Sequence, residues 1–162
     1  MKPIEYKQFC ETTYACPPGT NREEYLQLLL IEELGEVASL FAKAMRDGSL
    51  HFFDDGKFGE YKRIYGPKAV NREALIKELG DVMWCAAMLE DAENIEDWFD
   101  WPQFLDTPYG IEGWSVHTSP LEAACSMCQH YGFTPEEVAL ANVEKLKGRV
   151  QRGTLHGNGD ER

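Results

Sequence analysis

Hydrophobic residues recur at intervals of three and four in four stretches of the chain, which is the spacing of one helix face. The predicted helices run from Asn21 to about Met45, from Asn71 or Pro67 to about Asp91, from Ser119 to near Gly132, and from Thr134 to about Arg149. Asn, Ser and Thr are side chains that cap helix N-termini, and Glu137 completes a capping box with Thr134. The pattern predicts an all-α protein.

Two stretches lack this period, at about residues 49–70 and 94–119. The first is rich in Gly, Asp and aromatic residues, and the second contains Trp98, Trp101 and Trp114 among prolines and glycines. We expect two irregular insertions, of which the second would suit a lid or a subunit contact. With 162 residues, the chain is expected to form a single domain over 1–162.

The net charge is −12 and is unevenly spread, because residues 78–144 contain 14 acidic side chains and no Lys or Arg. We expect no nucleic-acid partner, since a phosphate backbone demands a cationic surface. Residues 145–162 contain five cations and two acids. A small phosphorylated ligand is therefore compatible with the charge distribution.

The protein is expected to be cytoplasmic and to have no membrane partner. Its N-terminus lacks the apolar region of a signal peptide, and no apolar run approaches the roughly 18 residues of a membrane span. Five cysteines without a secretory leader indicate reduced thiols. Cys125 and Cys128 have the spacing of half a zinc site, but no second pair exists, which favours buried thiols.

One acidic motif occurs in two of the predicted helices. Residues 31–37 read IEELGEV and residues 76–82 read IKELGDV, so five of the seven positions are identical and a sixth exchanges Glu for Asp. Gly35 and Gly80 each cost about 1 kcal/mol relative to alanine inside a helix. We expect these glycines to permit close approach of another helix or a ligand.

The carboxylates of the motif share helix faces with apolar residues, Glu33 with Glu36 in the first copy and Glu78 with Asp81 in the second. The apolar neighbours are Leu29 and Leu40 in the first copy and Ala74, Cys85 and Met88 in the second. Buried unpaired charges are costly, so the four converging acids need a cation. Oxygen-only ligands favour Mg²⁺ or Mn²⁺ over zinc.

The motif has two alternative interpretations. A di-iron bundle would need Glu-x-x-His on two helices, and none of the four histidines has Glu three residues before it. Alternatively, the glutamates lie at the solvent edge of two ordinary amphipathic helices. The occurrence of two near-identical copies favours the metal site.

Basic and amide side chains flank the acidic motifs. Lys43 and Arg46 follow the first motif on the same helix, and Asn142, Lys145 and Arg149 have the spacing of one face of the last helix. Cations and an amide beside a metal cluster are typical of a phosphoryl-group site. Alternatively, these residues form an ordinary solvent-exposed helix face and bind no ligand.

These motifs resemble those of the MazG-like all-α nucleoside triphosphate pyrophosphohydrolases, whose pattern is EExxE followed by ExxD. Residues 32–36 and 78–81 match it. The chain is similar to the short phage-associated members also in residues 43–48, 71–82, 141–146 and the tail 152–162. The two insertions depart from the family pattern, and insertions of this kind alter lids and base pockets.

The resemblance implies a helical bundle completed as a homodimer or homotetramer, in the host cytoplasm if the chain is phage-encoded. Glu33, Glu36, Glu78 and Asp81 would hold two or three Mg²⁺ ions, for which Mn²⁺ can substitute, and Glu32 would be auxiliary. Glu33 would be catalytic by orienting or deprotonating the water that attacks the α-phosphorus. The products would be a nucleoside monophosphate and pyrophosphate.

The resemblance also implies substrate contacts. Lys43, Arg46, Asn142 and Lys145 would bind phosphate oxygens, and Arg149 is a further substrate-binding candidate. The tail residues Arg152, Asp160 and Arg162 would close over the substrate, with a disordered C-terminus as the alternative. Trp84 is a candidate for base stacking, although aromatic residues at this spacing more often belong to the core. We expect a purine deoxynucleotide such as dGTP or dATP; a pyrimidine hydrolase related to the dimeric dUTPases and dCTPases is the alternative. A further alternative is a non-enzymatic acidic helical binding protein.

Overall fold

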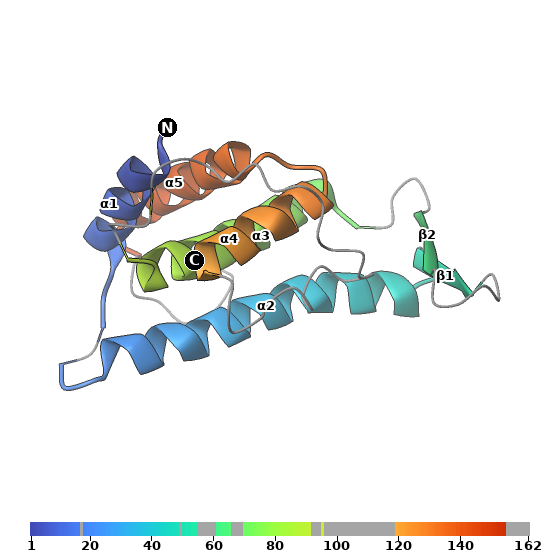
Figure 1. Cartoon of the computed structure of the whole chain (residues 1–162), viewed down its shortest axis with the longest axis horizontal. Helices are drawn as coiled ribbons and strands as arrows, with labels where there is room; N and C mark the ends of the chain where they lie inside the picture. Colours follow the sequence, from blue (N-terminus) through green and yellow to red (C-terminus); the bar gives the residue numbers. More distant parts are fainter. Residues whose placement is uncertain are drawn as a thin grey trace.

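The computed structural model describes residues 1–16, 18–48, 50–54, 61–65, 70–91, 95 and 119–154. The helices in these ranges are α1 (Pro3–Thr13), α2 (Arg22–Arg46), α3 (Arg72–Leu89), α4 (Pro120–His130) and α5 (Pro135–Arg152). Two strands, β1 (Leu50–Asp54) and β2 (Tyr61–Tyr65), form the sheet shown with them in Figure 1. The helical body confirms the all-α class. Within the same ranges no helix combines the length and hydropathy of a membrane span.

The four predicted helices begin at the expected caps. Asn21 and Asn71 each accept hydrogen bonds from two backbone N–H groups in the first turn of α2 and α3. Ser119 and Thr134 form capping boxes at the starts of α4 and α5, each with a glutamate three residues later. Gly153, with φ 66°, ends α5 in the left-handed conformation that glycine adopts readily.

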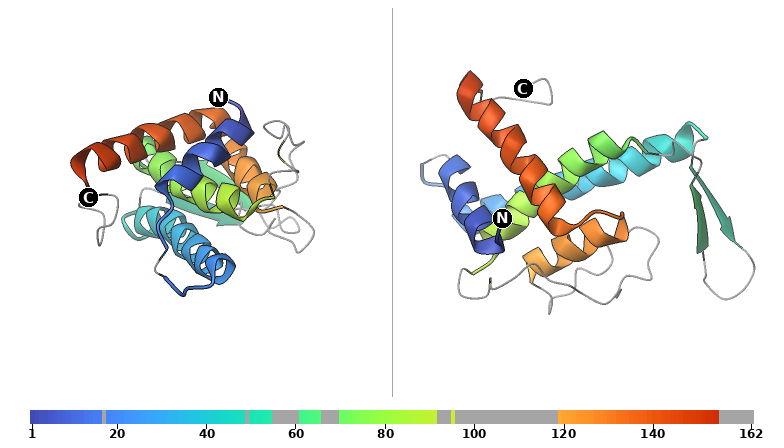
Figure 2. Two further views of the ribbon diagram at one scale, coloured as in Figure 1. Left: turned by 90° about the vertical axis from the view of Figure 1, so that its left-hand side faces the viewer. Right: turned by 90° about the horizontal axis from the view of Figure 1, so that it is seen from above.

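α3 is the central helix and packs against each of the other four (Figures 1 and 2). Its buried side chains lie all around the helix between Leu75 and Met88. A helix with buried residues on every side needs neighbours around it. α2 runs beside α3 in the opposite direction, and α5 crosses it in the right-hand view of Figure 2.

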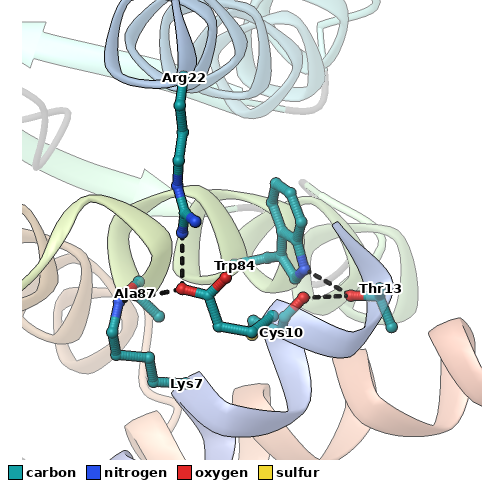
Figure 3. A network of polar contacts seen from close by, with 7 residues as sticks. Lys7, Cys10, Thr13, Arg22, Trp84 and Ala87 are labelled. Carbon is teal, nitrogen blue, oxygen red and sulfur yellow. Dashed lines mark hydrogen bonds and ion pairs between the residues drawn. The ribbon is translucent and has the colours of Figure 1, made fainter. Parts of the chain in front are cut away.

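α1 is a helix that the sequence pattern did not predict. It buries Tyr6, Cys10 and Thr13 at intervals of four and three, a helical period that is short and easily overlooked. Figure 3 shows how polar contacts attach it to α3. The indole N–H of Trp84 donates to Thr13 Oγ1 at 2.9 Å, and Lys7 Nζ donates to the Ala87 carbonyl at 2.9 Å.

The first insertion contains a β-hairpin, which corrects the expectation of an irregular segment at residues 49–70. Leu50 pairs with Tyr65 and Asp54 pairs with Tyr61 in an antiparallel register. The two segments, LHFFD and YKRIY, are rich in aromatic residues with high strand propensity. The hairpin projects from the end of α2, away from the helices (Figure 2).

The second insertion, predicted for residues 94–119, lies outside the described residues apart from Ile95 and Ser119. Its two ends meet. The buried carboxylate of Glu90 follows α3 and accepts a hydrogen bond from the Leu121 N–H at 3.4 Å, in the first turn of α4. A negative charge is favourable at this position because the helix dipole is positive there.

The cysteine pair of α4 belongs to the hydrophobic core. Cys125 and Cys128 are both fully buried. Burial raises the pKa of the Cys128 thiol well above its usual value, whereas metal binding needs the thiolate. The buried-thiol interpretation is confirmed.

Candidate functional site

The packing of α2 against α3 brings the two copies of the acidic motif together. The copies lie on neighbouring antiparallel helices (Figure 1). One carboxylate oxygen each from Glu33, Glu36 and Glu78 lies within 4.8 Å of the others. We call these three residues the glutamate cluster. The structure thus assembles three of the four acids that the sequence singled out as metal ligands.

Glu33 is placed by the hydrophobic stripe of α2. The buried residues of this helix are Leu26, Leu30, Val37, Phe41 and Ala44. Glu33 follows Leu30 by three residues and precedes Val37 by four, so it occupies a core position in the stripe that faces α3. A carboxylate at such a position is costly unless a partner compensates its charge.

The protonation of the cluster reflects this uncompensated position. Burial, then the charges of Asp81 and Glu36, raise the pKa of Glu33 to about 8. Burial and the neighbouring Glu36 carboxyl raise the pKa of Glu78 to about 7. Lys145 opposes both shifts. In the absence of a cation, the cluster therefore holds protons at neutral pH that ordinary surface glutamates have lost.

Asp81 lies beside the cluster and has protein partners of its own. It forms an ion pair with Lys145, and its other oxygen accepts a hydrogen bond from the Asn142 amide at 3.1 Å. Both partners come from α5, which crosses α3 at this point. Asp81 is not within the 4.8 Å group, but its charge acts on Glu33.

Glu32, the predicted auxiliary ligand, is exposed on α2. Its charge is the smallest of the five effects on the pKa of Glu33. The structure therefore places Glu32 at the edge of the site and outside the glutamate cluster.

The predicted phosphate contacts divide into near and distant groups. Asn142 is buried and Lys145 is half-buried, both directed at Asp81. Arg149 continues the same face of α5; it is half-buried, and its Nε is enclosed without a hydrogen-bond partner among the described residues.

Among the described residues, the other predicted contacts form no hydrogen bond or ion pair with the cluster. Lys43 and Arg46 are exposed near the end of α2, and Arg46 pairs with the adjacent Asp47 at 2.8 Å. Arg152 is exposed, with its guanidinium beside Gly148. Asp160 and Arg162 lie outside the described residues.

Trp84 is engaged with neighbouring elements of the fold. Its indole N–H binds Thr13 in α1, and its ring stacks on Tyr14 with centroids 6.3 Å apart. These contacts match the core interpretation of the residue. Base stacking by Trp84 stays a prediction that no described contact supports.

The two motif glycines have different surroundings. A Cβ added to Gly80 would lie 3.0 Å from Asn142 Cβ and 3.1 Å from its Nδ2, so glycine lets the Asn142 side chain pass over α3. The predicted close approach is thereby confirmed at Gly80. A Cβ on Gly35 would meet nothing within 4 Å, so no group of the described chain requires glycine there.

Tyr6 is the residue near the site that sequence reasoning missed. It is fully buried, and its hydroxyl donates to Asn142 Oδ1 at 2.9 Å. Its periodicity with Cys10 and Thr13 could have predicted α1, but no sequence feature connects Tyr6 to Asn142.

Comparison with known proteins gives no relative. No family model matches the chain, and neither the curated proteins nor the solved structures include a significant match. The functional argument therefore depends on the geometry and chemistry of the site.

Proposed function

We propose that the protein is a metal-dependent nucleoside triphosphate diphosphatase, which hydrolyses a nucleoside triphosphate to the monophosphate and pyrophosphate. The observation that supports this function best is the glutamate cluster, three carboxylates from two copies of one motif within 4.8 Å. The resemblance of the motifs to MazG-like enzymes supplies the reaction.

The residues of the cluster fit a hard divalent cation. All three donors are carboxylate oxygens, the ligand type that Mg²⁺ and Mn²⁺ prefer. Their mutual repulsion and partial burial raise the pKa of Glu33 and Glu78, and a bound cation would remove both penalties. Glu33, Glu36 and Glu78 would hold the first ion, and Asp81 is close enough to contribute to the two or three ions expected.

When bound, Mg²⁺ would neutralise phosphate charge and lower the pKa of a coordinated water. Glu33, in the centre of the acidic groups, would orient that water toward the α-phosphorus and accept its proton. It lies in the stripe of α2 that contains the buried residues Leu30 and Val37. A general base held this way needs little rearrangement before reaction.

The phosphate-binding side of the site would be formed by α5. Lys145 and Arg149 share one face of that helix, with Lys145 already at Asp81. Positive groups placed there would stabilise the charge that develops on departing pyrophosphate. Lys43, Arg46, Arg152, Asp160 and Arg162 remain proposed contacts that would have to approach when substrate binds.

The proposed substrate is a purine deoxynucleoside triphosphate, dGTP or dATP, by the resemblance to phage-associated enzymes. A pyrimidine substrate is the alternative within the same chemistry. A panel of the eight common nucleoside triphosphates with Mg²⁺ or Mn²⁺ tests both. Release of monophosphate and pyrophosphate only with metal is expected, and the preferred base follows from the relative rates. Absence of product from all eight, together with absence of metal binding, would contradict the proposal.

The proposed assembly is a homo-oligomer built on the outer face of α2. Leu28 and Ile31 are 62% and 67% exposed there, and Gly35, Ala38 and Ala42 continue the face at helical spacing. A second copy of α2, crossing antiparallel at Gly35, would fill the space that is open because Gly35 has no Cβ. This register pairs the large Leu28 with the small Ala42.

Charge favours the same antiparallel arrangement. Crossing at Gly35 brings Glu24 near the start of one α2 opposite Arg46 near the end of the other. Opposite charges at helix ends also complement the helix dipoles. A parallel pair would set like charges against each other, which is why we propose the antiparallel pair.

A binding protein without enzymatic activity is the second candidate, because residues 78–144 contain 14 acids and no Lys or Arg. If the protein is such a binding protein, its activity should not depend on Mg²⁺. Glu33→Gln should then leave binding to the partner unchanged. The diphosphatase predicts loss of turnover in that variant. One substitution therefore separates the two functions.

A further inference from the structure

A chain of buried polar groups connects α1 to the edge of the glutamate cluster. The Tyr6 hydroxyl donates to Asn142 Oδ1 at 2.9 Å, and Asn142 Nδ2 donates to Asp81 Oδ1 at 3.1 Å. Tyr6 is 0% exposed and Asn142 is 1% exposed. Three elements far apart in the sequence thus meet through one amide, which lies between a phenol and a carboxylate.

The fold makes room for this amide. Asn142 lies over Gly80 so closely that a Cβ there would be 3.0 Å from the asparagine side chain. Real Cβ atoms essentially never approach more closely than this. The glycine that costs helix stability in α3 therefore allows Asn142 to reach Asp81.

The donor and acceptor types determine which way the amide faces. An ionised Asp81 only accepts hydrogen bonds, so Asn142 must present its NH₂ group to it. The amide oxygen then points away and needs a donor. The Tyr6 hydroxyl supplies that donor at 2.9 Å, whereas its distance to the Gly80 carbonyl is a longer 3.4 Å.

Reversal of the amide would set its oxygen against the Asp81 carboxylate, which is repulsive. Without the Tyr6 hydroxyl, the amide oxygen would also lose its buried partner, and an unsatisfied buried acceptor is unfavourable. The hydroxyl thus stabilises one of the two amide orientations. That orientation is the one that holds Asp81 beside Lys145 and next to Glu33.

We propose that Tyr6 is a positioning residue for the metal site, which acts through Asn142 to hold the Asp81 carboxylate beside the glutamate cluster. This inference rests on the proposed metal-dependent function. It assigns to α1, a helix outside both acidic motifs, a part in metal binding. Tyr6 itself would not touch metal or substrate.

The test is the affinity of the full-length protein for Mn²⁺, measured by titration calorimetry for wild type and Tyr6→Phe. The substitution keeps the ring and removes the hydroxyl. We expect Mn²⁺ to bind about five-fold more weakly, the effect of losing one buried neutral hydrogen bond. Tyr14→Phe is the matched control, because Tyr14 contacts Trp84 and Arg22, and it should bind Mn²⁺ like wild type.

A double-mutant cycle separates positioning from general stability. In an Asn142→Ala background, Tyr6→Phe should no longer change Mn²⁺ affinity, because the residue through which it acts is absent. Equal losses in both backgrounds would overturn the inference, as would an unchanged affinity accompanied only by a lower melting temperature. If wild type itself fails to bind Mn²⁺, the proposed function fails instead.

Gly80→Ala provides a second variant if Tyr6→Phe does not fold. Alanine raises helix propensity, but its Cβ would press on the Asn142 side chain, which would have to shift by a few tenths of an ångström against Tyr6 and Asp81. We expect a loss of Mn²⁺ affinity in the same direction as that of Tyr6→Phe. Wild-type affinity in both Gly80→Ala and Asn142→Ala would overturn the inference, because the chain through Asn142 would then be dispensable.

Discussion

A carboxylate oxygen of Glu33 on α2 lies within 4.8 Å of a carboxylate oxygen of Glu78 on α3. The two residues occupy the same position in the two copies of the acidic motif. Like charges this close repel each other, and partial burial strengthens the repulsion. Such an arrangement lowers the stability of the metal-free protein, which is typical of a site shaped for a cation.

Replacing Glu33 with Gln should stabilise the metal-free protein while abolishing turnover. The amide is neutral without binding a proton, so the cost of keeping Glu33 uncharged in the folded protein at neutral pH disappears, and we expect a gain of about 1 kcal/mol, or roughly 3 °C in Tm. Thermal unfolding in EDTA measures the gain, and pyrophosphate release measures turnover. Glu32→Gln is the control, since Glu32 is exposed one residue away. Equal effects of the two substitutions would contradict the assignment.

The stability of the metal-free protein should fall as pH rises from about 5 to 8. The pKa of Glu33 is about 8 and that of Glu78 about 7 in the folded protein, above the unfolded value of about 4.3. The folded state therefore binds more protons over this interval, and it loses relative stability as they dissociate. Unfolding in EDTA at several pH values measures the slope, which should flatten in Glu33→Gln.

Mg²⁺ should reverse this trend, because it replaces the protons of the cluster. The rise in Tm on adding Mg²⁺ is expected to be larger at pH 8 than at pH 5.5, since fewer protons then compete for the carboxylates. Calorimetric titration at pH 7 in buffers of different ionisation enthalpy should detect proton release. A pH-independent Mg²⁺ effect would indicate that the ion binds elsewhere.

Lys145→Met should have opposite effects on metal binding and on turnover. Lys145 pairs with Asp81 and is the described cation that lowers the pKa of both Glu33 and Glu78. Its loss removes a charge that repels Mg²⁺, so metal affinity should stay equal or rise. Turnover should fall by about 10²-fold if the ammonium stabilises the leaving pyrophosphate. Lys147→Met, on the exposed side of α5, is the matched control.

Much of the fold follows from local sequence chemistry. Asn21, Asn71, Ser119 and Thr134 cap the helices that the periodic pattern predicts, because side-chain capping depends only on neighbouring residues. α1 was missed because its buried face consists of few residues. The hairpin of β1 and β2 was missed because strand pairing involves two segments, neither of which alternates clearly.

The candidate site was predictable to a similar degree. Repetition identified Glu33, Glu36 and Glu78, since two equal motifs on adjacent helices converge when the helices pack. The helix stripe, however, is centred on Leu30 and Val37, so Glu33 is closer to the core than the predicted Leu29–Leu40 face suggested. The Tyr6–Asn142 contact could not be predicted, because it depends on how α1 and α5 are oriented on α3.

The outer face of α2 gives a prediction about assembly. Ile31→Glu adds a charge where the proposed antiparallel pair is most apolar, so it should convert the oligomer to a monomer of 18.5 kDa. Sedimentation at micromolar concentration measures the mass. Leu140→Glu is the control, because Leu140 is 45% exposed on α5, and it should leave the assembly intact. Gly35→Cys tests where the two α2 helices cross. A disulfide between copies should form only if the helices meet at residue 35. A monomeric wild type, or an oligomer that survives Ile31→Glu, would exclude this face as the interface.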